Sequence, residues 1–233
     1  MPPPFPARAL GFVPKRRVGL LGGSFNPAHE GHRHIAELAL KRLGLDEVWF
    51  LVSPGNPLKK KDGMAPLAAR LASAEVQARH PRIRATTIER ELGTRFTADT
   101  LAALVRRFPR TEFVWLMGAD NLRQLPQWER WSTIFNTVPI AIFARPTYST
   151  KALAGKAAHR FSTARQRPRN GAARLASRKP PAWVFMHTRL HPASATSIRE
   201  RMNGDETKAG EDRPTRQGVN EQGRNPGDQH TEP

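Results

Sequence analysis

Short apolar runs alternate with segments of helical spacing along most of this chain, and that alternation constrains the fold more than any other feature. The runs predict strands at 17–21, 48–52, 82–86, 113–117, 138–143 and 183–186. Between them, apolar residues at three- and four-residue steps predict helices at 31–43, 66–79 and 97–108. Strands that alternate with helices predict an α/β fold: a Rossmann-like, doubly wound, mostly parallel sheet with helices on both faces. Such sheets bind ligands at the carboxyl ends of their strands.

Composition sets the boundaries of the folded part. Residues 1–16 are rich in proline, and the chain beyond residue 202 has too few apolar side chains to offset the entropy of ordering. We expect a flexible segment at 1–16, one folded domain at 17–202 and a disordered polar tail at 203–233. The absence of cysteine excludes disulfides, thiolate zinc sites and cysteine nucleophiles. No apolar run approaches the roughly 20 residues that span a bilayer, so a cytoplasmic protein is expected.

The net charge of +18 would ordinarily indicate a polyanionic partner such as nucleic acid. Its distribution argues against that interpretation, because about half of the excess lies in the segment 151–180, which has nine cations and no acidic residue. We interpret this segment as a basic insert or exposed loop. The net charge therefore does not indicate which ligand the main site binds. Neither nucleic acid nor a membrane is expected as a partner.

The stretch 22–32, between the first expected strand and the first expected helix, predicts a phosphate site. Its glycine pair lets backbone amides approach phosphate oxygens, and the start of a helix adds donors and partial positive charge. His29 and His32 are three residues apart, so both imidazoles face the same side of the first turn. A plain glycine turn with surface histidines is the alternative. A zinc site with Glu30 is weaker, since no third ligand lies nearby.

A second stretch near the end of the expected domain, 191–201, combines hydroxyls with an arginine. Ser194, Thr196 and Ser197 can each cap a helix, and Arg199 can clamp phosphate oxygens from the same helix end. Taken alone, the pattern fits a simple helix start equally well.

These stretches resemble the two signatures of the nucleotidyltransferase superfamily, whose histidine motif is shared with class I aminoacyl-tRNA synthetases. The first resemblance rests on Gly22-Gly23, Phe25, Pro27 and His29-Glu30-Gly31-His32, and the second on Ser194, Thr196 and Arg199. Between them, the stretches 95–101, 115–121, 126–131 and 144–146 resemble the bacterial nicotinate-mononucleotide adenylyltransferases. The resemblance spans about 17–202. It departs from the family at Leu58, before Lys59, where many members have histidine.

The resemblance implies an enzyme of NAD biosynthesis that transfers the adenylyl group of ATP to nicotinate mononucleotide, giving nicotinate adenine dinucleotide and pyrophosphate, with Mg²⁺ assisting. It implies catalytic roles for His29, His32 and Arg199, and no metal ligand from the protein. The implied ATP-binding residues are Gly22, Gly23, Ser24, Phe25, His29, His32, Gly118, Asp120, Ser194, Thr196, Ser197 and Arg199. The implied mononucleotide-binding residues are Asn26, Lys59, Thr97 and Trp128.

Three alternatives stay open at this point. Nicotinamide mononucleotide or phosphopantetheine could replace the acceptor, and a nucleic-acid-binding protein could be built on an inactive scaffold of this type. The sequence leaves the oligomeric state open.

Overall fold

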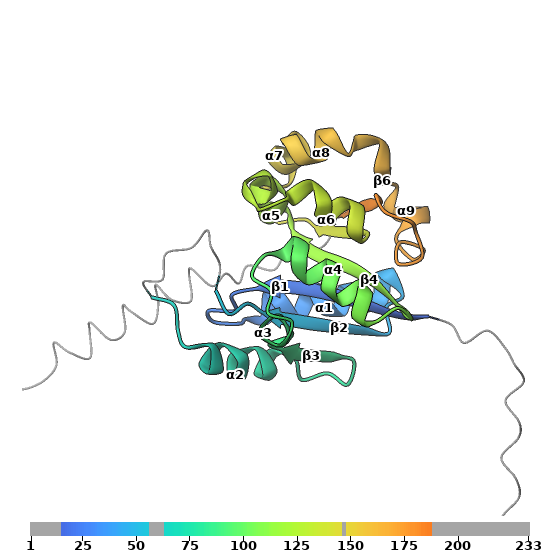
Figure 1. The fold of residues 1–233 in the computed structure, drawn as a ribbon. Helices are drawn as coiled ribbons and strands as arrows, with labels where there is room; N and C mark the ends of the chain where they lie inside the picture. Colours follow the sequence, from blue (N-terminus) through green and yellow to red (C-terminus); the bar gives the residue numbers. More distant parts are fainter. Residues whose placement is uncertain (1–14, 56–62, 146–147, 188–233) are drawn as a thin grey trace, which may run out of the picture.

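The computed structural model describes residues 15–55, 63–145 and 148–187. Within them, seven strands form one all-parallel sheet in the order β3-β2-β1-β4-β5-β7-β6 (Figure 1). This confirms the predicted Rossmann-like α/β fold and extends "mostly parallel" to every pair of strands. The strands are β1 (Arg16–Gly23), β2 (Glu47–Val52), β3 (Ile83–Thr86), β4 (Thr111–Gly118), β5 (Ile140–Phe143), β6 (Arg165–Gln166) and β7 (Trp183–Met186).

The strands form because their apolar side chains are buried on both faces of the sheet. On β2, Trp49 and Leu51 join one core cluster, whereas Val48 and Phe50 join the cluster on the other face. A strand that is covered on both sides has no polar alternation, which is why its sequence is a continuous apolar run.

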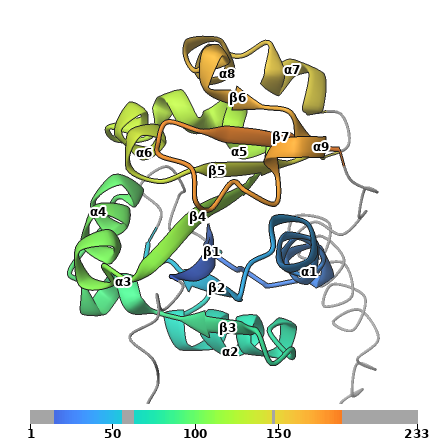
Figure 2. The ribbon, with the colours of Figure 1, turned by 90° about the vertical axis from the view of Figure 1, so that its right-hand side faces the viewer.

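Two helical layers cover these faces, and Figure 2 shows α1 and α4 on opposite sides of β1. One layer contains α1 (Glu30–Leu43), α2 (Leu67–Gln77) and the segment around α9 (Pro168–Gly171). The other contains α3 (Ile88–Glu91), α4 (Thr97–Arg107), α5 (Ala119–Gln124), η1 (Leu125–Gln127), α6 (Trp131–Thr137), α7 (Ser149–Leu153), α8 (Lys156–Arg160) and η2 (Ser162–Ala164). None of the described helices is long and apolar enough to cross a membrane.

The parallel arrangement fixes where the helices begin. Each strand enters the sheet from the same edge, so each helix that follows a strand starts at the opposite, carboxyl edge. The helix α1 follows β1 and ends at Gly44, whose φ of 61° is the left-handed conformation that stops a helix. The amino ends of α1, α4 and α5 are thus brought to one edge of the molecule.

The basic segment 151–180 is part of these layers. It forms α7, α8, β6 and α9, and β6 pairs with β7 at the end of the sheet. The expectation of an exposed loop is wrong, because Ala157, Phe161 and Leu175 stand between the cations and are buried. Whether the segment is an insert stays a prediction. The expected flexible segment and polar tail lie outside the described residues, apart from Lys15 and Arg16 at the start of the sheet.

Candidate functional site

The carboxyl ends of β1 and β4 form the point where the connections of the sheet change direction. These neighbouring strands pair in parallel, with Leu21 opposite Leu116. The chain runs from β1 outward to β2 and β3 on one side. On the other side it runs from β4 to β5, then to β6 at the edge, and returns to β7 between them. Open α/β sheets bind ligands in the crevice at such a point. The stretch 22–32 follows β1 and Asp120 follows β4, so the structure brings both to this edge.

The two histidines form the amino end of α1. His29 is the N-cap residue, and its Nδ1 accepts a hydrogen bond of 3.2 Å from the backbone N–H of Gly31. In return, the Nδ1 of His32 accepts the backbone N–H of His29 at 3.2 Å. This is a capping box in which two imidazoles replace the usual hydroxyl and carboxylate. The ring centroids lie 3.9 Å apart, so the helix start holds the two rings as one unit.

The capping box also selects the tautomer of both rings. A nitrogen that accepts a hydrogen bond has no proton, so each neutral ring keeps its proton on Nε2. Each ring therefore offers its Nε2–H as a donor at the amino end of α1. Imidazole N–H groups and the positive end of the helix dipole together favour a polyphosphate oxygen.

The loop before α1 is fixed by packing. Phe25 has a φ of 48°, is 2% exposed, and packs its ring against Phe50 at 5.3 Å and His32 at 4.8 Å. A side chain at Gly22 would overlap the ring of Trp115, whereas one at Gly23 would lie 3.4 Å from Phe25. The sequence assigned both glycines to phosphate approach. The structure gives Gly22 a packing reason, and the phosphate role of both stays a prediction.

Arg70 is a site residue that the sequence analysis missed. It lies on α2, is 2% exposed, and donates to the carbonyls of Ser24, Ser53 and Ala65 at 2.8, 2.7 and 2.9 Å. No carboxylate partner is recorded for it among the described residues, and burial lowers the pKa of its guanidinium. Arg70 therefore ties the loops after β1 and β2 to α2 and adds a buried positive charge beside the loop that precedes α1. The sequence did contain a signal of its burial: Arg70 is three residues from Leu67 and four from Ala74, which places it on the same helix face as these apolar residues.

Asn26 holds the same loop from its other side. Its Nδ2 donates to the carbonyl of Gly63 at 2.8 Å, and its Oδ1 accepts the N–H of Ala65 at 3.2 Å. The N–H of Ala28 donates to the hydroxyl of Ser73 on α2 at 3.0 Å. These contacts give Asn26 a structural task, and its mononucleotide-binding role stays a prediction.

At the end of β4, Gly118 leaves room for an ion pair. Asp120 Oδ1 lies 3.2 Å from Arg145 Nε, and a side chain at Gly118 would overlap the atoms of both. The pair lacks hydrogen-bond geometry, so Asp120 Oδ1 is a buried oxygen that accepts no hydrogen bond from the described residues. Arg145 follows β5. The sequence analysis included it only in the stretch 144–146 that resembles the family, and the structure places it beside Asp120.

Thr97 and Trp128, two of the residues predicted to bind the mononucleotide, are linked through an ion pair. Thr97 is the first residue of α4, and Trp128 ends η1 with its ring half-buried against the core. Between them, Arg130 donates to Asp99 at 2.5 Å, which joins the start of α4 to the turn that holds Trp128.

Some predicted residues lie outside the described residues: Lys59, Ser194, Thr196, Ser197 and Arg199. Their roles stay predictions. The described residues contain no group of three or more His, Cys, Asp or Glu side chains that could hold a metal ion.

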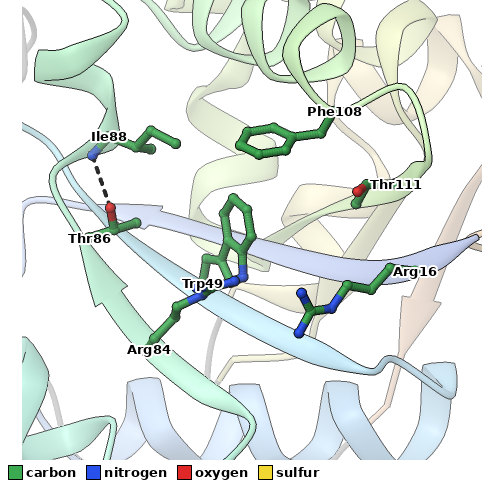
Figure 3. Close-up of a pocket in the computed structure, with 7 residues that line it drawn as sticks. All are labelled: Arg16, Trp49, Arg84, Thr86, Ile88, Phe108 and Thr111. Carbon is green, nitrogen blue, oxygen red and sulfur yellow. Dashed lines mark hydrogen bonds between the residues drawn. The ribbon is translucent and has the colours of Figure 1, made fainter.

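A cavity of about 230 Å³ opens at a different place (Figure 3). Its lining includes Arg16 and Thr111, the first residues of β1 and β4, so it reaches the amino edge of the sheet, away from the switch point. Its two arginines, Arg16 and Arg84, both pair with Glu47. We therefore keep this cavity apart from the candidate site.

Comparisons with known proteins agree with this geometry. The model of the cytidylyltransferase-like family matches residues 20–201. Over 182 residues the chain is 54% identical to a probable nicotinate-nucleotide adenylyltransferase of Cereibacter sphaeroides, covering 78% of this chain and 95% of the relative. A protein of Parvibaculum lavamentivorans with the same name is 54% identical over 195 residues, covering 84% and 96%. The solved nicotinic acid mononucleotide adenylyltransferase of Plasmodium falciparum, complexed with NaAD, shares the fold at a TM-score of 0.61 and 14% identity, covering 83% and 89%.

Proposed function

The chain belongs to the cytidylyltransferase-like family and, within it, to the nicotinate-nucleotide adenylyltransferases, and from this premise we propose its reaction and site. It transfers the adenylyl group of ATP to nicotinate mononucleotide, producing nicotinate adenine dinucleotide and pyrophosphate for NAD biosynthesis. The observation that carries the placement of the site is the pair of imidazoles in one capping box at the β1/β4 switch point.

The reaction needs positioning and charge stabilisation, without a protein nucleophile. An oxygen of the acceptor 5′-phosphate forms a bond to the α-phosphorus of ATP, and the bond from that phosphorus to the bridging oxygen breaks in line, releasing pyrophosphate. Negative charge spreads over the phosphate oxygens during transfer. His29 and His32 donate from Nε2 to these oxygens at the positive end of the α1 dipole. The capping box holds both donors before substrate arrives, so little reorganisation is needed during the reaction.

The nucleotide extends from α1 across the switch point towards β4. Asp120 supports this placement, because it follows β4 at this edge and its side chain is partly exposed, so its carboxyl group can accept a ribose hydroxyl. The acceptor lies towards Thr97 and Trp128, whose ring offers a face to the pyridine.

An adenylyltransferase that uses ATP is expected to require a divalent ion, and we propose Mg²⁺. The described residues do not suit a metal cage built by the protein alone. Mg²⁺ commonly keeps several waters and binds through substrate phosphates. It would arrive on the triphosphate and neutralise part of its charge. A cytoplasmic location also stays a prediction.

Pyrophosphate release tests the assignment. The full-length protein is assayed with ATP and Mg²⁺ and with nicotinate mononucleotide, nicotinamide mononucleotide or phosphopantetheine as the acceptor. A kcat/KM at least about tenfold higher for the first is the expected result. Preference for another acceptor would overturn the substrate. Release with none, together with salt-sensitive binding of DNA or RNA, would support the nucleic-acid-binding alternative.

A further inference from the structure

The buried guanidinium of Arg70 lies beside the loop that leads into α1, and the proposed reaction does not use it. Its Nη1 donates to the carbonyl of Ser24 at 2.8 Å and to that of Ser53 at 2.7 Å. Its Nε donates to the carbonyl of Ala65 at 2.9 Å, and Nη2 lies 3.4 Å from the carbonyl of Pro54. Every partner recorded for it among the described residues is a backbone carbonyl. Arg70 therefore acts on the path of the main chain.

The bond to Ser24 sets the direction of one backbone donor. In a trans peptide unit the C=O and the N–H point in opposite directions. The unit that joins Ser24 to Phe25 is trans, and its carbonyl points at Arg70. The N–H of Phe25 therefore points away from Arg70. No hydrogen bond of this N–H is recorded among the described residues.

Other amides near the histidines already have partners inside the protein. The N–H of Ala28 donates to the hydroxyl of Ser73, and the capping box occupies the N–H groups of His29 and Gly31. The N–H of His32 donates to the carbonyl of His29 at 2.9 Å. A backbone N–H needs an acceptor, and loops of this kind offer such groups to anions. The N–H of Phe25 is thus a donor that a ligand oxygen can take.

Phe25 needs its neighbours to keep this orientation. Its φ of 48° lies in the left-handed region, which bulky side chains rarely adopt. Such a conformation persists only where the surrounding structure fixes it. The loop is fixed on either side of Phe25, by Arg70 at the carbonyl of Ser24 and by the side chain of Asn26, which bonds to the segment before α2. Without Arg70, the Ser24–Phe25 unit can rotate towards a relaxed conformation, and the N–H turns with it.

We infer that Arg70 is a positioning residue for adenylyl transfer: by holding the carbonyl of Ser24, it aims the N–H of Phe25 at a polyphosphate oxygen of ATP. Arg70 acts through this peptide unit and does not itself touch the substrate. His29 follows Phe25 by four residues, so the backbone donor and the imidazole donors belong to one loop. That the anion is the triphosphate of ATP rests on the proposed function, whereas the orientation of the peptide unit does not.

The shape of the guanidinium matters for this role as well as its charge. A guanidinium is a rigid planar fork, and here Nη1 reaches two loops while Nε reaches a third segment. Lysine keeps the charge but presents its three donors from a single atom, so it cannot hold the same carbonyls together. Arg70→Lys therefore tests the orientation at constant charge, and Arg70→Met removes both the fork and the charge.

The kinetic test measures kcat and KM for ATP at saturating nicotinate mononucleotide, with each enzyme concentration corrected for its folded fraction. Loss of one such donor typically lowers kcat by about 10²–10³, so a misdirected donor should lower it at least about tenfold in Arg70→Lys and in Arg70→Met. Arg79→Lys is the matched control, because Arg79 is exposed just beyond the end of α2, and it should stay within about twofold of the wild type. A kcat of Arg70→Lys within about twofold of the wild type would overturn the inference, because charge alone would then suffice.

Backbone amide NMR provides a readout that a loss of stability would not imitate. Inorganic pyrophosphate is titrated into the protein without any acceptor, and the exchange of the Phe25 amide with solvent is followed. In the wild-type protein this amide should exchange freely at first and be protected at least about tenfold at saturation. Arg70→Lys should bind pyrophosphate at least about tenfold more weakly and leave the Phe25 amide unprotected.

The titration also separates this inference from the proposed function. If no acceptor releases pyrophosphate in the activity assay, the proposed function fails and the titration alone decides the role of Arg70. The wild-type arm needs no variant, so it stands even where Arg70→Met does not fold. A Phe25 amide that is already protected in the free wild-type protein, or equal protection in Arg70→Lys, would refute the orientation argument.

Discussion

The imidazole capping box predicts that the structural and chemical roles of the two histidines can be separated by substitution. In the double variant His29→Asn, His32→Gln, the asparagine amide oxygen at the N-cap accepts a backbone N–H, and the glutamine at the third helical position reaches back to the N-cap N–H. The box is rebuilt with standard residues and α1 keeps its start. Both Nε2–H donors to phosphate are lost.

The magnitudes differ enough to distinguish the two roles. Removing a cap with alanine costs roughly 0.5–2 kcal/mol, so His29→Ala, His32→Ala should lower the free energy of unfolding by about 1–2 kcal/mol. The Asn/Gln variant should stay within about 0.5 kcal/mol of the wild type. One lost oxyanion donor typically lowers kcat by about 10²–10³. Both double variants should therefore lose at least about a hundredfold in kcat/KM, although only one loses stability.

Urea unfolding and pyrophosphate release with ATP and nicotinate mononucleotide provide the two readouts. His159→Asn on the exposed face of α8 is the control and should change neither. Activity within about threefold of wild type in the Asn/Gln variant would refute the donor role and leave the histidines as caps. Instability of that variant equal to the alanine pair would refute the capping argument instead.

Three further predictions concern the frame of the site. Arg70→Met removes four hydrogen bonds to backbone carbonyls and should lower the free energy of unfolding by about 3 kcal/mol in urea titrations, with Arg70→Lys in between. Burial raises the pKa of Glu89 from 4.5 to about 7, so the folded state binds the extra proton between these values and its stability contribution is lost as pH rises through them. Glu89→Gln should lack this loss, which amounts to up to about 3 kcal/mol between pH 4.5 and pH 8 by urea unfolding. Gly22→Ala should destabilise by about 1–3 kcal/mol through overlap with Trp115, whereas Gly23→Ala should fold normally and raise the KM for ATP; equal unfolding energies for the two would contradict the packing argument.

The long elements were predictable because a single rule dominates each of them. The expected strand at 183–186 coincides with β7, and the helix expected at 31–43 differs from α1 by one residue at its start. Continuous apolar runs cannot be stable as loops, and the alternation of such runs with helices leaves few topologies. The site edge follows from the same rule, because 22–32 and Asp120 each come directly after a buried strand.

The elements that sequence missed are held by tertiary partners. The strand β6 has only two residues, Arg165 and Gln166, and is a strand because it pairs with Trp183 and Val184 of β7. The four-residue helix α3 has no apolar period to detect. Such segments carry too little local signal, and their structure depends on neighbours that are distant in sequence.

The sequence analysis missed the buried polar residues Arg70 and Glu89 for a different reason. Arg70 and Glu89 belong to types that are mostly exposed, so a reading by residue type assigns them to the surface. Their burial follows from which loops meet at Ser53, and this depends on the pairing of β1 with β2 and on the place of α2. The partner carbonyls leave no trace in the sequence, since every residue has one.

The place of the basic segment 151–180 in the sheet offers a physical explanation for part of its charge. It surrounds β6, the last strand in the order, and Arg165 lies over the ring of Trp183 at 5.3 Å. Short edge strands with positively charged residues resist pairing with the edges of other molecules. Three strands, β4, β5 and β7, separate this edge from β1 and its histidines. The cation on β6 therefore protects a sheet edge that lies three strands away from the histidines. It follows that replacing Arg165 with alanine should leave the kinetics with ATP unchanged while making the protein more prone to self-association.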